Sequence, residues 1–184
     1  EILYHPLPDG VDFIELYNRS RKTINLKTLQ IANQTDDSHF KNNYWLTTTG
    51  YLLFPNDFVV LTTNPSVVKE QYTTTHPKKF LTLQHLPSMP NDSGRLALLD
   101  KHLFIIDQMN YNDTMQFSLL TSSEGVSLER IDYDGSSLTP NKWHSAAQTV
   151  GFATPAYKNS QYNDFSTDDN KTVTLSSDIF SPDN

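Results

Sequence analysis

The chain contains no cysteine, which excludes disulfide bonds, thiolate metal sites and a cysteine nucleophile. It also lacks an excess of positive charge, because 14 Lys and Arg stand against 21 Asp and Glu, a formal net charge of −7. Binding to nucleic-acid phosphates depends on clustered Lys and Arg that displace counterions. The composition therefore disfavours nucleic acid as a partner.

Long hydrophobic runs are missing as well. No apolar stretch approaches the ~20 residues that a transmembrane helix needs, so we expect no transmembrane segment in this sequence. A chain of 184 residues is nevertheless long enough to bury a sizeable core without a disulfide or metal to stabilise it. Burial of apolar side chains is therefore the expected source of stability.

Motifs for metal or nucleophilic chemistry are also absent: there is no HExxH, GxSxG or phosphate-binding glycine loop. We expect no metal centre, no cofactor and no enzymatic activity. A glycoside hydrolase needs two carboxyl groups across a cleft, and the sequence offers no geometry for such a pair. A hydrolytic enzyme is therefore the least favoured reading. The candidate carboxylates are Asp12, Glu15, Asp57, Asp100, Asp107, Glu129 and Asp132.

Two short segments, residues 91–94 and 132–135, resemble fragments of calcium-binding loops. Neither contains the full alternating set of oxygen ligands that ends in a Glu. Asp, Asn, Ser and Gly at these positions are also typical of tight turns, and this interpretation is favoured. A weak calcium site near Asp92 or Asp132 remains an open alternative.

The clearest secondary-structure signal lies at residues 11–18, where β-branched, aromatic and polar residues alternate with a period of two. Apolar side chains fall on both faces, so the segment is predicted to be a central strand. Residues 2–4 precede it across an Asp-Gly turn, which predicts a hairpin. Glu15 places a carboxylate inside this strand, and a buried carboxylate requires a partner.

The remainder of the chain is predicted to be short strands separated by turns, with one short helix. Asn64 is a favoured N-cap and Pro65 a favoured first helical residue, which predicts a helix at residues 65–72. Residues 33–43 are polar and are expected to form a surface loop, and residues 23–31 one bent strand. Residues 95–99 and 103–109 are expected to pair as a second hairpin. The pattern is typical of an all-β sandwich.

A set of apolar residues from these strands is predicted to form the core. Trp143 is expected to be buried in it. Arg130 follows Leu128 on the inward face of a strand at residues 125–131, and we predict that it pairs with Glu15. The alternative is that Arg130 points outward and Glu15 bonds backbone amides or a Tyr hydroxyl. The predicted core is Phe13, Ile14, Leu16, Val59, Leu61, Leu98, Ile105, Leu128 and Trp143.

Six stretches of the chain occur together in an order that matches a known family: residues 12–18, 58–62, 86–91, 127–131, 143–147 and 153–160. Taken together, they resemble the lamin tail domain family, in particular its exported bacterial members. The resemblance implies an immunoglobulin-like β-sandwich. It implies a non-catalytic structural, adhesive or protein-interaction module of a secreted or surface-attached bacterial protein, outside the cell. Its partner would be a protein or polysaccharide at the cell surface.

The domain organisation expected from this comparison has three parts. Residues 1–160 form the lamin-tail-like domain. Residues 161–172 are polar and acidic without apolar periodicity, and are expected to be a linker. Residues 173–184 resemble the opening of a following β-domain, or would add an extra edge strand to the sandwich.

A carbohydrate-binding module is the second reading, because aromatic residues are plentiful and stacked aromatic rings bind sugars. Trp45 lies in the most polar neighbourhood, so Trp45 with Tyr51 is the candidate platform. Aromatic residues in β-sandwiches more often form core and cross-strand pairs. An exposed row of coplanar rings would favour the carbohydrate reading, and a deep pocket with two convergent carboxylates would favour the enzyme.

Overall fold

The computed structural model describes residues 1–36, 39–74 and 76–146, and within these the fold is mostly β with one short α-helix. Three 3-10 turns, η1 (Leu26–Thr28), η2 (Asp113–Met115) and η3 (Pro140–Lys142), and the helix α1 (Pro65–Gln71) interrupt the strands. The strands are β1 (Ile2–Leu3), β2 (Phe13–Tyr17), β3 (Ile24–Asn25), β4 (Leu29–Gln34), β5 (Phe40–Trp45), β6 (Leu52–Leu53), β7 (Phe58–Thr62), β8 (Phe80–Thr82), β9 (Ser93–Asp100), β10 (Ile105–Asn112), β11 (Leu128–Arg130) and β12 (Trp143–Ser145).

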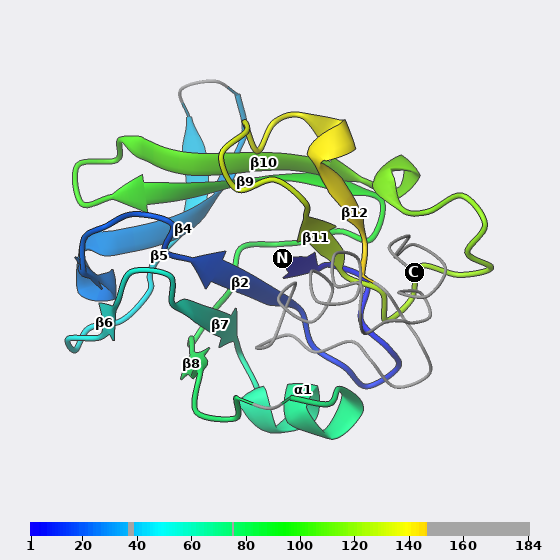
Figure 1. Ribbon diagram of the computed structural model, residues 1–184, viewed down its shortest axis with the longest axis horizontal. Coiled ribbons are helices and arrows are strands. Elements are labelled where there is room, and N and C mark those ends of the chain that lie inside the picture. Colours follow the sequence, from blue (N-terminus) through cyan, green and yellow to red (C-terminus); the bar gives the residue numbers. More distant parts are fainter. Residues whose placement is uncertain (37–38, 75, 147–184) are drawn as a thin grey trace, which may run out of the picture.

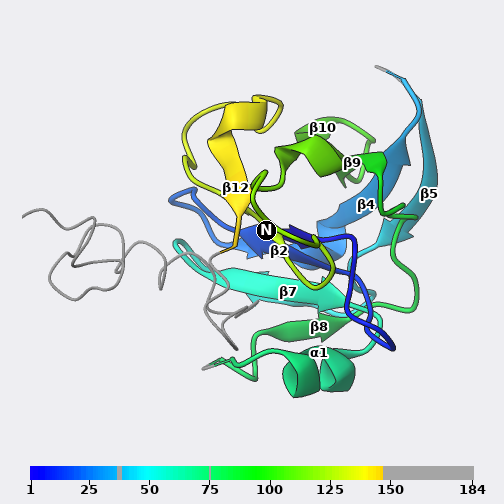
Figure 2. The same cartoon turned by 90° about the vertical axis from the view of Figure 1, so that its right-hand side faces the viewer.

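The described strands form three sheets. A six-stranded sheet has the order β12-β11-β1-β2-β7-β8, a four-stranded sheet has the order β10-β9-β4-β5, and β3 pairs with β6. All pairs are antiparallel except β7 and β8. Figure 2 shows β9, β10, β4 and β5 above β2, β7 and β8, with α1 below them. Figure 1 shows the same order.

The predicted opening hairpin is confirmed. Ile2 pairs with Ile14 and Leu3 with Phe13, and β2 also pairs along its whole length with β7, so it is a central strand. Its alternation separates two clusters: Ile14 belongs to the main core, whereas Phe13 belongs to a second cluster that includes Val68 of α1. Apolar residues are therefore needed on both faces of β2.

The main core contains buried residues from both large sheets, for example Ile14 and Leu61 of the six-stranded sheet and Ile31 and Leu96 of the four-stranded one. Most of the predicted core is confirmed. Leu16 and Leu98 are half-buried against this cluster. The predicted residues that are buried are Phe13, Ile14, Val59, Leu61, Leu128 and Trp143.

Ile105 is an exception, and its predicted burial is wrong: it is 38% exposed. The β9–β10 ladder shifts register between Ile105 and Asp107, so that Ile105 lies opposite Leu99 and Asp107 opposite Leu98. Leu98 packs against the main core, whereas Leu99 belongs to a separate cluster on the other face. The bulge therefore gives Asp107, and not Ile105, the inward position, since an extra residue re-aims the side chains of a strand.

The helix prediction is confirmed in position and in mechanism. The side chain of Asn64 accepts hydrogen bonds from the backbone N–H groups of Ser66 and Val67, and Pro65 begins the helix. The helix connects β7 to the parallel strand β8. Parallel neighbours cannot be joined by a tight turn, so a crossover segment is required here. Val68 of the helix is buried against the six-stranded sheet.

Two other predicted elements differ from the structure. Residues 33–43 do not form one loop, because β4 continues to Gln34 and β5 begins at Phe40. Residues 23–31 are not one bent strand, because η1 separates β3 from β4. The predicted linker at residues 161–172 and the segment 173–184 lie outside the described residues. None of the described helices combines the length and hydrophobicity needed to cross a membrane.

Candidate functional site

A cavity of about 500 Å³ lies where the two large sheets, η1 and the loop after β11 meet. Ten of its 23 lining residues have large apolar side chains, contributed by β2, β4, β6 and β9 among others, and most of the rest are polar or charged. Its volume lies within the range of small-molecule sites, about 300–1,000 Å³. The apolar lining residues are Leu16, Ile24, Leu26, Leu29, Leu53, Leu98, Ile105, Ile106, Leu138 and Trp143.

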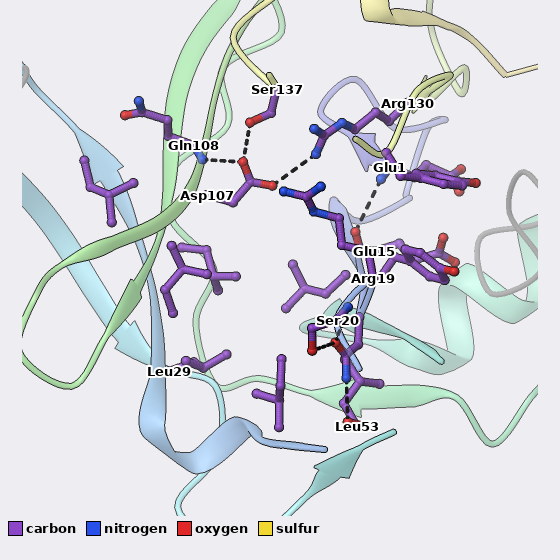
Figure 3. A pocket seen from close by; sticks show the side chains of 18 of the residues that line it. Glu1, Glu15, Arg19, Ser20, Leu29, Leu53, Asp107, Gln108, Arg130 and Ser137 are labelled. Carbon is purple, nitrogen blue, oxygen red and sulfur yellow. Dashed lines mark hydrogen bonds and ion pairs between the residues drawn. The ribbon is translucent and has the colours of Figure 1, made fainter. Parts of the chain in front are cut away.

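One end of the cavity is polar and centres on Asp107 (Figure 3). The guanidinium of Arg130 donates to Oδ2 of Asp107 at 3.2 Å. The backbone N–H of Gln108 donates to Oδ1 at 2.9 Å, and the hydroxyl of Ser137 donates to the same oxygen. Donors therefore engage both oxygens of this carboxylate.

Arg130 is held in place by more than Asp107. Its Nε donates to the carbonyl of Asp132 at 3.0 Å, and an Nη donates to the carbonyl of Gly135. Its side chain is only 14% exposed. Arg130 lies two residues after Leu128, which is in the main core, so it points inward as the sequence predicted. With Asp107 on β10, it forms an ion pair between the two large sheets.

Glu15 is buried, at 6% exposure, as expected from the sequence. It lies one residue after Ile14, whose side chain faces the main core, so the alternation of β2 directs Glu15 to the other face. Arg130 lies on the core-facing side of β11. Arg130 forms an ion pair with Asp107, and both Arg130 and Glu15 are among the residues that line the cavity. The predicted pair between Glu15 and Arg130 stays a prediction.

The proposed aromatic platform is divided between two environments. Trp45, at the end of β5, is 48% exposed. Tyr51, just before β6, is half-buried and packs against the main core. Burial raises the pKa of the Tyr51 hydroxyl above its ordinary value. Trp45 is thus available to a ligand, whereas much of Tyr51 contributes to the core.

Five exposed apolar side chains lie in the cavity lining beside Asp107 or directly precede it in the chain; we call them the apolar rim. Ile105, Ile106 and Leu138 line the cavity and are 38%, 52% and 40% exposed. Leu103 and Phe104 lie in the β9–β10 turn, directly before Ile105, and are 47% and 71% exposed. The sequence showed the apolar run at residues 103–106, but its periodicity suggested a core strand.

The two segments that resemble calcium loops differ in structure: residues 91–94 lead into β9, which begins at Ser93, whereas residues 132–135 form a bend after β11. Oδ1 of Asp132 accepts from the N–H groups of Asp134 and Gly135, and Oδ2 accepts from Nζ of Lys142 at 2.8 Å. Lys142 and these amides hold the pKa of Asp132 at about 2. Asp92 accepts from the N–H of Ser93. Within the described residues, no three acidic or His side chains gather to hold a metal ion.

A His–Glu pair lies on β12, an edge strand of the six-stranded sheet, and its neighbour β11. His144 on β12 is directly opposite Glu129 on β11, with Nε2 3.8 Å from the carboxylate. Burial lowers the pKa of His144, which outweighs a hydrogen bond to the carbonyl of Ser145. The neutral imidazole is therefore favoured, and this pair is a structural contact between the strands.

Comparison with known proteins adds nothing to this geometry. No protein-family model matches the chain, and no curated protein matches its sequence.

Proposed function

We propose that the chain is a non-catalytic protein-interaction or adhesive module of a secreted or surface-attached bacterial protein, with a lamin-tail-like, immunoglobulin-type β-sandwich. The sandwich is supported by a main core drawn from both large sheets. The extracellular setting is supported by the sequence resemblance described above. The partner is a protein at the cell surface, which binds at the apolar rim.

The observation that carries this proposal is the exposure of the apolar rim. Soluble domains rarely leave adjoining large apolar residues in water, and such patches mark interaction sites. Phe104 is the most exposed of the rim residues, at 71%, and Ile106 is 52% exposed. An aromatic side chain at the centre of an interface commonly supplies much of the binding free energy.

The polar groups of the cavity support a binding role over a catalytic one. The carboxylate of Asp107 accepts from Gln108, Ser137 and Arg130. Both oxygens of this carboxylate are therefore occupied by structural contacts within the protein. Asp107 therefore acts as an inter-sheet anchor.

The test uses microspheres coated with the full chain, applied to surfaces that carry either extracellular proteins or polysaccharides. We expect retention on the protein surface, and Phe104→Ser should weaken it about 30-fold, the effect of losing about 2 kcal/mol of binding free energy. The matched control is Phe117→Ser, which removes a Phe that is 59% exposed and lies outside the rim.

Three outcomes would contradict the proposal. The first is equal retention of the wild-type and Phe104→Ser microspheres on the protein surface. The second is an equal loss with Phe117→Ser, which would mean general stickiness of exposed apolar groups. The third is retention on polysaccharide or lipid-coated surfaces alone.

A carbohydrate-binding function is the second candidate, and one observation favours it: the 48% exposure of Trp45. A single exposed indole can stack on one sugar ring. If this function is correct, Trp45→Ala should abolish retention on the polysaccharide surface while Phe104→Ser leaves it unchanged.

A further inference from the structure

The cavity has the size of a ligand site. It shares Ile105, Ile106 and Leu138 with the rim, but Phe104, the most exposed rim residue, does not line it. Side chains of both large sheets and of η1 contribute to it, and protein interiors normally pack as closely as organic crystals. A space of about 500 Å³ is much larger than a packing defect and falls within the range of small-molecule sites. The deeper wall is aliphatic: Leu16, Leu26, Leu29, Leu53 and Leu98.

The polar end of the cavity contains a cation that can change partners. Arg19 lines the cavity, and Figure 3 shows its side chain extending toward the end where Asp107 and Arg130 lie. Its ion pair is with Asp134, at 3.2 Å, and the two side chains are 56% and 96% exposed. An ion pair this exposed contributes little, about 0–1 kcal/mol, so Arg19 can exchange Asp134 for an anionic ligand group.

We propose that this cavity binds a single-chain amphiphile with a carboxylate head group, placing the aliphatic chain among the leucines and the carboxylate against Arg19. The aliphatic chain matches the part of the wall that the five leucines form. A guanidinium is the side chain best suited to a carboxylate, because it can donate two parallel hydrogen bonds. This activity is independent of the proposed protein-interaction function.

A cationic head group fits this end of the cavity less well. Asp107 is one of three acidic residues that line the cavity, with Glu1 and Glu15, and both of its oxygens already accept hydrogen bonds, from Gln108, Ser137 and Arg130. A ligand amine would also lie beside the positive charge of Arg19. The order of affinity is therefore carboxylate above alcohol, and alcohol above amine.

The test is calorimetric titration of the full chain with decanoate, decan-1-ol and decylamine, each below its micelle concentration. Wild type binds decanoate most tightly. Arg19→Gln weakens decanoate about tenfold, the size of one charge-assisted hydrogen bond, and leaves decan-1-ol unchanged. Arg21→Gln is the matched control, since Arg21 is exposed and does not line the cavity.

A second variant tests the aliphatic walls. Leu98→Phe places a larger side chain on a half-buried wall position and should weaken decanoate and decan-1-ol together, by about tenfold or more. Phe104→Ser does not change the cavity lining and should leave decanoate binding intact, even if it abolishes protein binding. Failure of this proposal is thus distinguishable from failure of the proposed function.

Several results would overturn the inference. They are no heat of binding for decanoate at millimolar concentration, a preference for decylamine, or decanoate binding that Arg19→Gln does not change. The chain can also be sedimented with neutral phosphatidylcholine vesicles, with and without added decanoate. Equal binding to both kinds of vesicle would show that the chain binds a bilayer and not the acid. If decanoate in the vesicles raises their affinity for the chain, and Arg19→Gln removes that increase, the carboxylate of a membrane-borne acid binds in the same site.

Discussion

At the scale of the residue, Arg130 shows how a single polar side chain connects two sheets. The sequence indicated that it points inward and binds a carboxylate, and the structure pairs it with Asp107. Asp107 was recognised in the sequence only as one of several acidic residues. Its inward direction depends on the bulge between Ile105 and Asp107, and that register is set by β9, not by local sequence.

The first prediction concerns this inter-sheet ion pair. Arg130→Met should lower the free energy of unfolding by about 2–3 kcal/mol, because the carboxylate and two carbonyls lose their donor. This value is below that of a fully buried pair, since the side chain of Asp107 is 49% exposed. Urea unfolding measures the change, with Arg19→Gln as the exposed control. Equal changes for the two variants would contradict this role for Arg130.

The second prediction concerns Gly94, which lies opposite Tyr111 in the β9–β10 ladder. A Cβ at Gly94 would approach the Tyr111 hydroxyl to 2.5 Å. Tyr111 cannot move freely, because its ring stacks on Tyr4 at 4.4 Å and its hydroxyl donates to the carbonyl of Pro90. Gly94→Ala should therefore destabilise the fold by about 1–3 kcal/mol, as overpacking does.

The control for this substitution is Gly50→Ala. A Cβ at Gly50 would meet nothing closer than Asn25, at 3.9 Å. The midpoint of thermal unfolding should therefore change little in this variant. If Gly94→Ala and Gly50→Ala unfold at the same temperature, Tyr111 does not pack against residue 94 as described.

The third prediction concerns the pH dependence of stability. Burial raises the pKa of Asp12 from 3.8 to about 6. Between these values the folded state binds more protons than the unfolded chain, so the contribution of Asp12 to stability falls as the pH rises through this window. Asp12→Asn should therefore raise the free energy of unfolding at pH 7 by about 1 kcal/mol, a value reduced for solvent screening. Below pH 4 the gain should vanish, and chemical denaturation at several pH values measures it. A gain that is equal at pH 4 and pH 7 would contradict a raised pKa.

At the scale of the element, the sequence predicted best what depends on local chemistry. The helix followed from the capping side chain of Asn64 and from Pro65, both of which act within the first turn. The strand β5 was missed because it is an edge strand with exposed polar positions, so its sequence resembles a loop. The interruption of residues 23–31 by η1 was missed as well. The side chain of Asn25 caps this turn, but alternating apolar residues on both sides of it predicted a continuous strand.

The fourth prediction concerns the cap of α1. Asn64→Ala removes the acceptor for the N–H groups of Ser66 and Val67, and should lower the free energy of unfolding by about 1 kcal/mol. Asn64→Ser keeps a capping oxygen and should restore most of the loss. Chemical denaturation compares the three proteins. A Ser variant no better than the Ala variant would show that the side-chain cap does not stabilise the helix.

At the scale of the whole molecule, the cavity and the apolar rim result from how the sheets meet. The lining comes from segments that are far apart in the chain, from β2 to β12, so no local pattern could predict it. The sequence did contain the rim as an apolar run, but a period-two pattern cannot distinguish a core strand from an exposed one without its partner.

The fifth prediction tests the central claim, that the apolar rim is the binding surface. A benzophenone amino acid is placed at Ile106 on the rim and, separately, at Trp45 on β5; both positions are about half exposed. Each protein is bound to the extracellular-protein surface, irradiated and examined for covalent adducts. We expect adducts from position 106 and few from position 45, because the partner packs against the rim. Adducts from position 45 and none from position 106 would contradict the account.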